Sequence, residues 1–146
     1  MSIVERLGRA GIVPVIVIEK EEQAVPLARA LVKGGLPVLE VTFRTKAAAG
    51  AIAAIKGEVP EAILGAGTLL TPQMVKEAKD AGAVFGVAPG FDPVVMAAAK
   101  EIGLPMCPGI ATASELSQAL TAGCEMVKFF PAEAADATAL VRKIRG

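Results

Sequence analysis

Apolar runs and segments with a helical pattern alternate along the whole chain. Each run is rich in aliphatic or β-branched residues, and each is followed by a stretch whose small and apolar side chains recur at helical spacing. The runs predict strands at 12–18, 37–43, 62–68, 83–88 and 104–107, and a sixth strand in the middle of the stretch 125–133. The stretches after them predict helices at 21–32, 46–56, 72–82, 93–103, 113–123 and 134–145, and a short helix at 2–10 precedes the first strand.

Capping residues support these boundaries. Thr71 and Asp92 each precede a proline, the combination typical of an N-cap followed by the first helical residue. Thr112 begins a capping box, because a glutamate follows three residues later. Thr45 is expected to cap the helix after the second strand, and Gly57 is expected to end it.

The strand-helix units recur at a steady period. Equivalent strand positions are separated by 23, 26, 21, 21 and 21 residues, counted from Val15, Val38, Leu64, Phe85, Met106 and Val127. Such a period with short loops predicts parallel strands joined by right-handed crossovers. A doubly wound sheet and a β/α barrel both fit this pattern. The uninterrupted apolar run at 12–18 is typical of a strand covered on both faces.

Two features favour the barrel. Polar residues recur where strands end, at Glu40, Arg44, Thr68 and Lys128, and barrel enzymes keep their chemistry at that end of the strands. The segment 65–67 is the nearest approach to a dinucleotide fingerprint, and it lacks the third glycine. We therefore expect an α/β fold of the TIM-type (β/α) barrel class, in one domain over residues 1–146. It has only six units, whereas a full barrel has eight in about 250 residues, so a C-terminally incomplete, truncated barrel is expected.

Composition narrows the possible partners. Formal net charge is zero, with 15 basic and 15 acidic side chains and no basic cluster, so no nucleic-acid partner is expected. Pro, Gly or charge interrupts every apolar run before it could cross a bilayer, and residues 1–6 resemble a helix start rather than a signal peptide. Cys107 and Cys124 match no metal spacing and are expected to be buried thiols in a reducing cytoplasm.

Residue types that are missing restrict the chemistry further. The chain has no histidine, tyrosine or tryptophan. This excludes Ser-His-Asp and Cys-His catalysis and any histidine-ligated metal. Acid-base chemistry must therefore use Glu, Asp, Lys or a group of the substrate, and no metal or cofactor is expected.

One lysine interrupts the apolar run of the sixth predicted strand. Because strand side chains alternate between faces, Lys128 and Phe130 share one face and Val127 and Phe129 share the other. A lone ammonium on a buried face is costly unless it is paired or loses its proton. The simpler alternative is a lysine at a strand end that extends to water.

An acid on the second strand gives this lysine a partner. Glu40 would lie close to Lys128 near the carboxyl ends of the strands if its face points into the barrel. A neutral lysine attacks a ketone carbon to form a Schiff base, and the acid can carry the proton. Arg44 could bind a carboxylate in bidentate fashion, and Thr68 could add a hydroxyl. Taken alone, Arg44 also fits a solvated charge, and Thr68 a turn or cap residue.

Short segments along nearly the whole chain resemble one enzyme family. The chain resembles the 2-keto-3-deoxy-6-phosphogluconate (KDPG) aldolases and the related 4-hydroxy-2-oxoglutarate (KHG) aldolases at 13–17, 39–45, 65–68, 88–90, 108–110 and 128–133. The resemblance implies a class I aldolase that cleaves KDPG to pyruvate and glyceraldehyde 3-phosphate. It also implies that Lys128 is the Schiff-base lysine and Glu40 the general acid/base.

The same resemblance implies the remaining site residues and the assembly. Arg44 and Thr68 would hold the carboxylate of the 2-keto acid, and the pocket would be lined by Val15, Pro89 and Phe130. The family fold is an eight-unit β/α barrel that usually forms a trimer, which implies a homo-oligomer.

This sequence departs from the family beyond its sixth unit. The family's seventh and eighth units carry a Thr-Gly-Gly motif and a Gly-Gly-Ser segment that bind the substrate phosphate, and nothing in this chain corresponds to them. We expect an aldolase with impaired phosphate recognition; the alternative is a catalytically silent barrel fragment with a structural or assembly role. A sugar-phosphate epimerase fits less well, because it gives Lys128 no purpose. Open strand edges predict either an oligomer or a closed smaller barrel.

Overall fold

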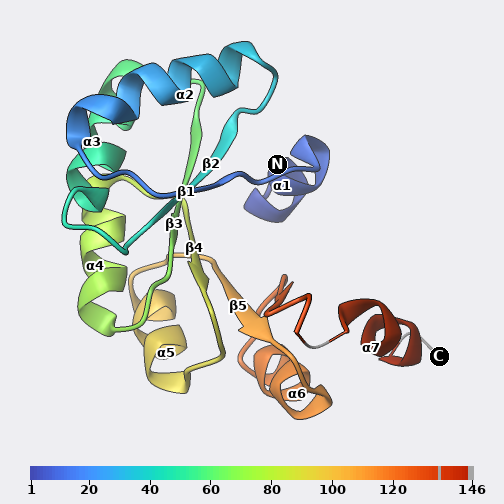
Figure 1. Ribbon diagram of the computed structural model, residues 1–146. Helices are drawn as coiled ribbons and strands as arrows, with labels where there is room; N and C mark the ends of the chain where they lie inside the picture. The colour runs from blue at the N-terminus through green and yellow to red at the C-terminus, as the bar shows by residue number, and fades with distance from the viewer. Residues whose placement is uncertain (135, 145–146) are drawn as a thin grey trace.

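The chain folds as one parallel sheet with helices on its two faces (Figure 1). The computed structural model describes residues 1–134 and 136–144. The strands are β1 Val15–Ile16, β2 Val38–Thr42, β3 Ile63–Gly67, β4 Phe85–Ala88, β5 Met106–Ile110 and β6 Lys128–Phe129. The helices are α1 Ile3–Ala10, η1 Glu21–Gln23, α2 Ala24–Lys33, α3 Ala48–Glu58, α4 Pro72–Ala81, α5 Pro93–Glu101, α6 Ala113–Thr121 and α7 Ala137–Ile144.

The strands lie side by side in the order in which they occur along the chain. The sheet order is β1-β2-β3-β4-β5-β6, and every neighbouring pair is parallel. A doubly wound sheet would reverse its order at a switch point, so the predicted TIM-type barrel class is confirmed. β1 and β6 are the two ends of this order. The described strands therefore form an open half-barrel of six βα units, and the alternative of a closed smaller barrel is wrong.

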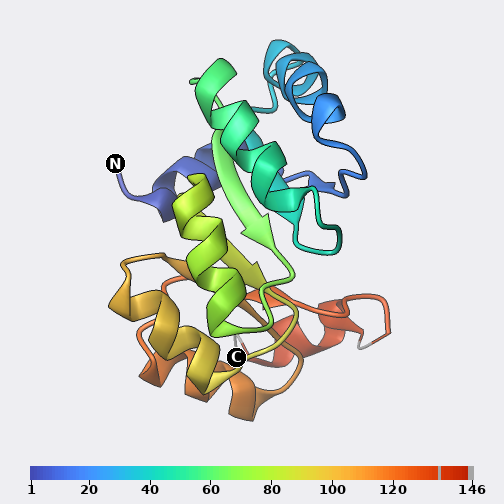
Figure 2. The ribbon, with the colours of Figure 1, turned by 90° about the vertical axis from the view of Figure 1, so that its left-hand side faces the viewer.

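Two apolar layers hold the half-barrel together. The larger lies between the sheet and the outer helices, where side chains such as Leu39, Ile52 and Val75 are buried. Figure 2 shows α3 and α4 in front of the sheet on this convex side. The smaller layer lies on the concave face, where Val38 and Phe85 pack with side chains of α1. Helix α1 therefore covers the amino-terminal ends of the strands and leaves their carboxyl ends as the accessible rim.

Three of the predicted helix starts are present with their caps. The Thr71 hydroxyl accepts a hydrogen bond from the Met74 N–H at 3.2 Å, and the Asp92 carboxylate accepts one from the Val94 N–H at 2.8 Å. Thr112 forms the predicted capping box. Each bond satisfies an N–H that the first helical turn leaves without a partner, so α4, α5 and α6 begin where the sequence predicts.

The first strand differs from its prediction. β1 has only two paired residues, and its burial alternates: Ile16 and Ile18 are buried, whereas Val15 is 59% and Val17 46% exposed. The expectation that this strand is covered on both faces is wrong. β1 is an edge strand, and its concave-facing side chains point toward the open side of the half-barrel.

The loop after β2 also differs. Thr45 does not cap α3, whose N-cap is Ala47. The Thr45 hydroxyl instead donates a hydrogen bond of 2.6 Å to the Ile18 carbonyl, which ties this loop to the end of the first unit. Gly57 does not end the helix, which continues through Glu58.

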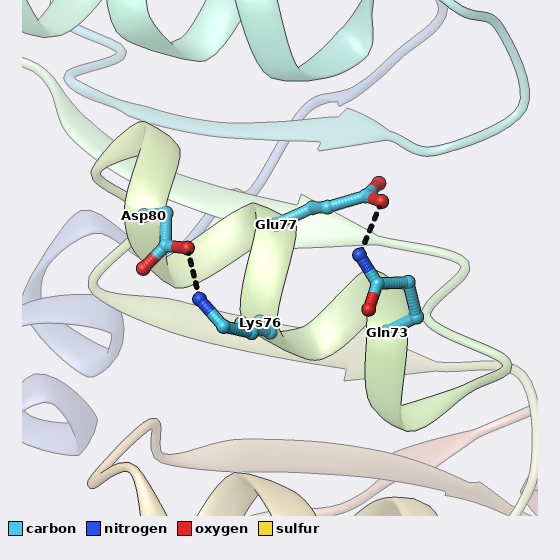
Figure 3. A network of polar contacts seen from close by, with 4 residues as sticks. All are labelled: Gln73, Lys76, Glu77 and Asp80. Atoms are coloured by element: carbon cyan, nitrogen blue, oxygen red, sulfur yellow. Dashed lines mark hydrogen bonds and ion pairs between the residues drawn. The ribbon is translucent and has the colours of Figure 1, made fainter.

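The outer face of α4 is polar and solvated (Figure 3). Gln73 Nε2 donates to Glu77 Oε1 at 2.8 Å, and Lys76 Nζ pairs with Asp80 Oδ2 at 2.7 Å. These i,i+4 contacts stabilise the helix little because water screens them, and they leave the opposite, apolar stripe of the helix facing the sheet. Within the described residues, no helix combines the length and hydropathy needed to span a membrane.

Candidate active site

The strand register places Glu40 and Lys128 on the concave face of the sheet. Glu40 is opposite Val15 on one side and Gly65 on the other, and Gly65 is opposite Phe85. On the last pair, Lys128 is opposite Gly109. Val87 of β4 is opposite Cys107 of β5. Side chains alternate along each strand, so these pairs lie on one face that continues across all six strands. The predicted convergence of the acid and the lysine on one face is therefore consistent with the register.

Glu40 is a buried acid with two cations near it. Its side chain is 5% exposed. Burial raises the pKa of the Glu40 carboxyl above its ordinary value, while the charge of Lys128 and, to a smaller extent, that of Arg44 act in the opposite direction. The desolvation effect is the largest, so the carboxyl holds its proton to higher pH than a solvated glutamate would.

Lys128 lies over an aromatic ring. Its Nζ atom is 4.7 Å from the centroid of the Phe130 ring, a cation–π geometry. The shared face predicted for these two residues is confirmed by this contact. Phe130 itself is 41% exposed, so the ring forms a wall at the rim and leaves Lys128 reachable from outside.

The charge of Lys128 acts on Glu40 although the two residues do not form an ion pair. Among the described residues, ion pairs within 4.0 Å join Arg29 to Glu58 and Lys76 to Asp80. The Lys128 charge nevertheless lowers the pKa of Glu40. The amine of Lys128 and the carboxyl of Glu40 are therefore more than 4.0 Å apart.

Three other predicted residues follow consecutive strands at the same rim. Arg44 comes just after β2 and is exposed, and Thr68 and Pro89 come directly after β3 and β4 and are half-buried. Thr68 has a φ of 60°, in the left-handed region that β-branched residues rarely adopt. Such local strain is concentrated at binding and catalytic sites, which favours a site role over an ordinary turn.

Val15 lies beside Glu40 but at the open edge. The two residues are register partners on β1 and β2. At 59% exposure, Val15 forms a boundary of the concave face that is open to solvent. Its expected part in lining a pocket stays a prediction.

One residue at the site was missed from the sequence. Cys107 was treated only as a buried thiol, yet it lies on the concave face of β5, two residues before the partner of Lys128. Burial raises its pKa to about 11, with the Lys128 charge lowering it and the Glu40 charge raising it. The signal in the sequence was parity on the fifth strand, which the prediction ended at Cys107 and the structure extends to Ile110.

A pocket among the described residues lies away from this rim. Its volume is about 450 Å³, and it is lined by residues of α1 and of the amino-terminal ends of β5 and β6, including Ile3, Met106 and Met126. None of the predicted site residues lines it. The residue chemistry at the carboxyl rim, rather than cavity size, therefore identifies the candidate site.

Nearly the whole chain is similar to proteins of one known family. The family model described as KDPG and KHG aldolase matches residues 3–146. The KHG/KDPG aldolase of Escherichia coli strain K12 is 51% identical over 140 residues, covering 96% of this chain and 66% of that protein. The 2-dehydro-3-deoxy-phosphogluconate aldolase of Treponema pallidum strain Nichols is 50% identical over 141 residues, covering 97% and 67%.

One solved relative holds a covalent intermediate formed with pyruvate. The structure of KDPG aldolase from Legionella pneumophila holds pyruvate captured at low pH as a covalent carbinolamine intermediate. It superimposes with a TM-score of 0.86 at 41% identity, covering 90% of this chain and 64% of that one. The present chain thus spans about two thirds of the length of these relatives.

Proposed function

Because the chain belongs to the KDPG and KHG aldolase family, we propose that it is a class I aldolase whose substrate is KDPG and whose products are pyruvate and glyceraldehyde 3-phosphate. The observation that carries this proposal is that a lysine at the rim and a buried acid lie on the same concave face. Lys128 and Glu40 are near enough for the lysine charge to affect the acid, and they do not form an ion pair.

The reaction begins with Lys128. Its neutral amine attacks C2 of the 2-keto acid to give a carbinolamine, which loses water to form a protonated imine. Glu40 then accepts the proton of the C4 hydroxyl as the C3–C4 bond breaks. The electron pair of that bond passes into the imine to give an enamine, and the aldehyde leaves. Proton transfer from Glu40 to C3 and hydrolysis of the imine release pyruvate and restore the amine. The carbinolamine held by the Legionella relative supports the first step.

Burial suits Glu40 to carrying this proton. A general acid/base works best when its pKa is near the working pH, and burial moves the pKa of Glu40 upward from that of a solvated glutamate. The opposing effects of Lys128 and Arg44 keep the carboxyl able to give up its proton as well as hold it. Glu40 is therefore our candidate for both proton transfers.

Residues at the rim would hold the substrate. Arg44 is an exposed guanidinium close enough to affect Glu40, and it is proposed to bind the substrate carboxylate together with the Thr68 hydroxyl. The apolar wall beside the imine is assigned to Phe130, Pro89 and Val15. Phe130 carries the strongest support, because its ring contacts Lys128.

We assign no phosphate site to the residues of this chain. The sequence has no counterpart of the phosphate-binding motifs that the family resemblance implies. Binding energy from a remote phosphate normally lowers the barrier at the reacting carbons. A protein made of these residues alone is therefore proposed to recognise the phosphate weakly and to cleave KDPG less efficiently than a full-length relative.

Copies of this chain are proposed to associate. β1 and β6 are the ends of the sheet, and unpaired strand edges favour pairing with other chains. A homo-oligomer is expected, with a trimer as the family-based expectation. The free thiols of Cys107 and Cys124 suit a reducing compartment such as the cytoplasm.

Borohydride reduction in the presence of pyruvate tests the proposed chemistry. The expected result is a stable pyruvyl adduct on the peptide that contains Lys128, identified by mass spectrometry. The variant Lys128→Met should give no adduct, and the control Lys100→Met, which changes a lysine away from the rim, should give as much as the unmodified chain. No adduct on Lys128 at high pyruvate would contradict the proposal and favour a silent structural role.

A further inference from the structure

The concave face of β3 has no side chains along its carboxyl-terminal half. The two positions after Ile63 that face inward are Gly65 and Gly67. Side chains from the neighbouring strands lie over both. The Phe85 ring of β4 covers Gly65, and the Glu40 side chain of β2 covers Gly67. The space over this half of β3 is therefore filled by side chains of the neighbouring strands.

The fit of Glu40 over Gly67 leaves no space for a methyl group. A Cβ atom placed on Gly67 would lie 2.8 Å from Glu40 Cγ and 2.9 Å from its Cδ, and it would also collide with Oε1. Real Cβ atoms essentially never come within 3.0 Å of other heavy atoms. Because the collision involves the stem of Glu40 and not only its tip, the whole side chain would have to turn.

Glu40 has little freedom to turn while keeping its place. Its strand neighbours Leu39 and Val41 are fully buried on the opposite face, which fixes the backbone. Below it, the Phe85 ring fills the space over Gly65 and is itself 1% exposed. The side that remains open is that of β1, where the register partner Val15 is 59% exposed.

We propose that Gly67 is a positioning residue for the aldolase reaction: its bare backbone lets the Glu40 side chain lie along β3 at the rim, facing the lysine across the concave face. This inference rests on the proposed function for its catalytic consequence. The packing part stands on the described contacts alone. Gly67 does not occupy the left-handed backbone region, so its role is to leave space and not to permit an unusual backbone conformation.

Deuterium exchange into the methyl group of pyruvate measures the step that needs Glu40. Exchange requires the imine on Lys128 and then proton removal from C3, whereas borohydride trapping requires only the imine. In Gly67→Ala we expect exchange to fall about 100-fold, the effect of misplacing a reacting group by about 1 Å, while trapping stays within about twofold. Exchange in Glu40→Gln should fall similarly, and Glu40→Gln/Gly67→Ala should fall no further. The control Gly57→Ala, where a Cβ meets nothing within 4 Å, should change neither.

A double-mutant cycle on thermal unfolding tests the packing without catalysis. Gly67→Ala should lower the melting temperature of the unmodified chain by about 4 °C or more. It should lower that of Glu40→Ala much less, because the colliding side chain has then been removed. If Gly67→Ala alone fails to fold, the double variant should fold as Glu40→Ala does.

The outcomes separate this inference from the proposed function. If the unmodified chain forms no adduct but the cycle shows coupling, the aldolase proposal fails and the placement of Glu40 by Gly67 stands. If adduct forms but Gly67→Ala exchanges deuterium at the unmodified rate, the inference is wrong. Equal destabilisation by Gly67→Ala with and without Glu40 would also overturn it.

Discussion

Lys128 Nζ lies 4.7 Å from the centroid of the Phe130 ring. A ring at this distance stabilises a cation by about 0.5–1 kcal/mol at a partly exposed site, and it therefore favours the cationic imine over the neutral amine that attacks pyruvate. We therefore expect Phe130→Leu, which keeps apolar bulk but removes the ring, to reduce the yield of trapped pyruvyl adduct by about two- to fivefold. Adduct yield across a range of pyruvate concentrations measures this effect.

The neighbouring ring supplies the control for that variant. Phe129 is adjacent to Lys128 in β6, and alternation turns it to the other face. Phe129→Leu should leave the adduct yield close to that of the unmodified chain. Equal losses in the two variants would show that Phe130 acts through general packing of β6 and not through its contact with the amine.

Cys107 makes stability depend on pH in the alkaline range. Burial raises the pKa of its thiol from 9.0 to about 11, so the folded chain keeps a proton that the unfolded chain loses. The stability that the buried, protonated thiol contributes is fully present below pH 9, and it is lost as the pH rises through about 11. Two pKa units correspond to about 2.7 kcal/mol. Urea unfolding at pH 8 and pH 10.5 should show a larger loss of unfolding free energy in the unmodified chain than in Cys107→Ala.

Lysine titration affects both chains in that experiment equally, so the difference between them isolates the thiol. Cys124→Ala is a useful second comparison, because burial raises the pKa of Cys124 too. An identical pH response of the unmodified chain and Cys107→Ala would refute the assignment of Cys107 to a desolvated position.

Thr42 ties the short edge strand to the sheet. Its buried hydroxyl donates a hydrogen bond of 3.1 Å to the carbonyl of Ile16 in β1. Thr42→Val keeps the shape but leaves that carbonyl without this donor, which should cost about 1–3 kcal/mol of unfolding free energy. Thr42→Ser keeps the hydroxyl and should recover part of the loss.

Hydrogen exchange gives the location of that effect. Amides around 15–18 should exchange faster in Thr42→Val, whereas amides of β3 and β4 should change little. Uniform acceleration throughout the chain would mean that the bond supports the whole fold and not the edge strand in particular.

The open edges predict self-association. Sedimentation velocity over a wide concentration range should detect species larger than one chain, because β1 and β6 end the sheet and Val15 and Val17 are exposed on its concave side. A lysine introduced on the edge, Val17→Lys, should shift the distribution toward monomer. A single monomeric species at all concentrations would contradict the proposed assembly.

Local patterns were sufficient to predict much of this fold. Alternation along a strand is a property of the backbone, so the shared face of Lys128 and Phe130 followed from their spacing. Capping is equally local, and Thr71 and Asp92 begin their helices as expected. The steady unit period predicted parallel strands, which the sheet confirms.

Contacts between neighbouring strands could not be obtained this way. How far the side chains of a strand are buried depends on whether the strand lies at the edge of the sheet. The apolar run around Val15 does not show this, so Val15 was expected to be buried, whereas it is exposed. Which side chain lies over Gly67 depends on register and sheet curvature together. Thr45 was a plausible cap by composition, but the Ile18 carbonyl was a partner from another unit. The concave-face position of Cys107 was missed for another reason, because the predicted fifth strand ended at this residue and its alternation with the residues that follow was not used.

The sheet order has a consequence for how the chain folds during synthesis. Each strand pairs with the strand made just before it, so most pairings close short stretches of chain and need no distant partner to be translated first. Units can therefore be added to a growing sheet in the order in which the ribosome delivers them. Every stage of that growth ends in one newly exposed strand, and β6 holds that position in the described structure.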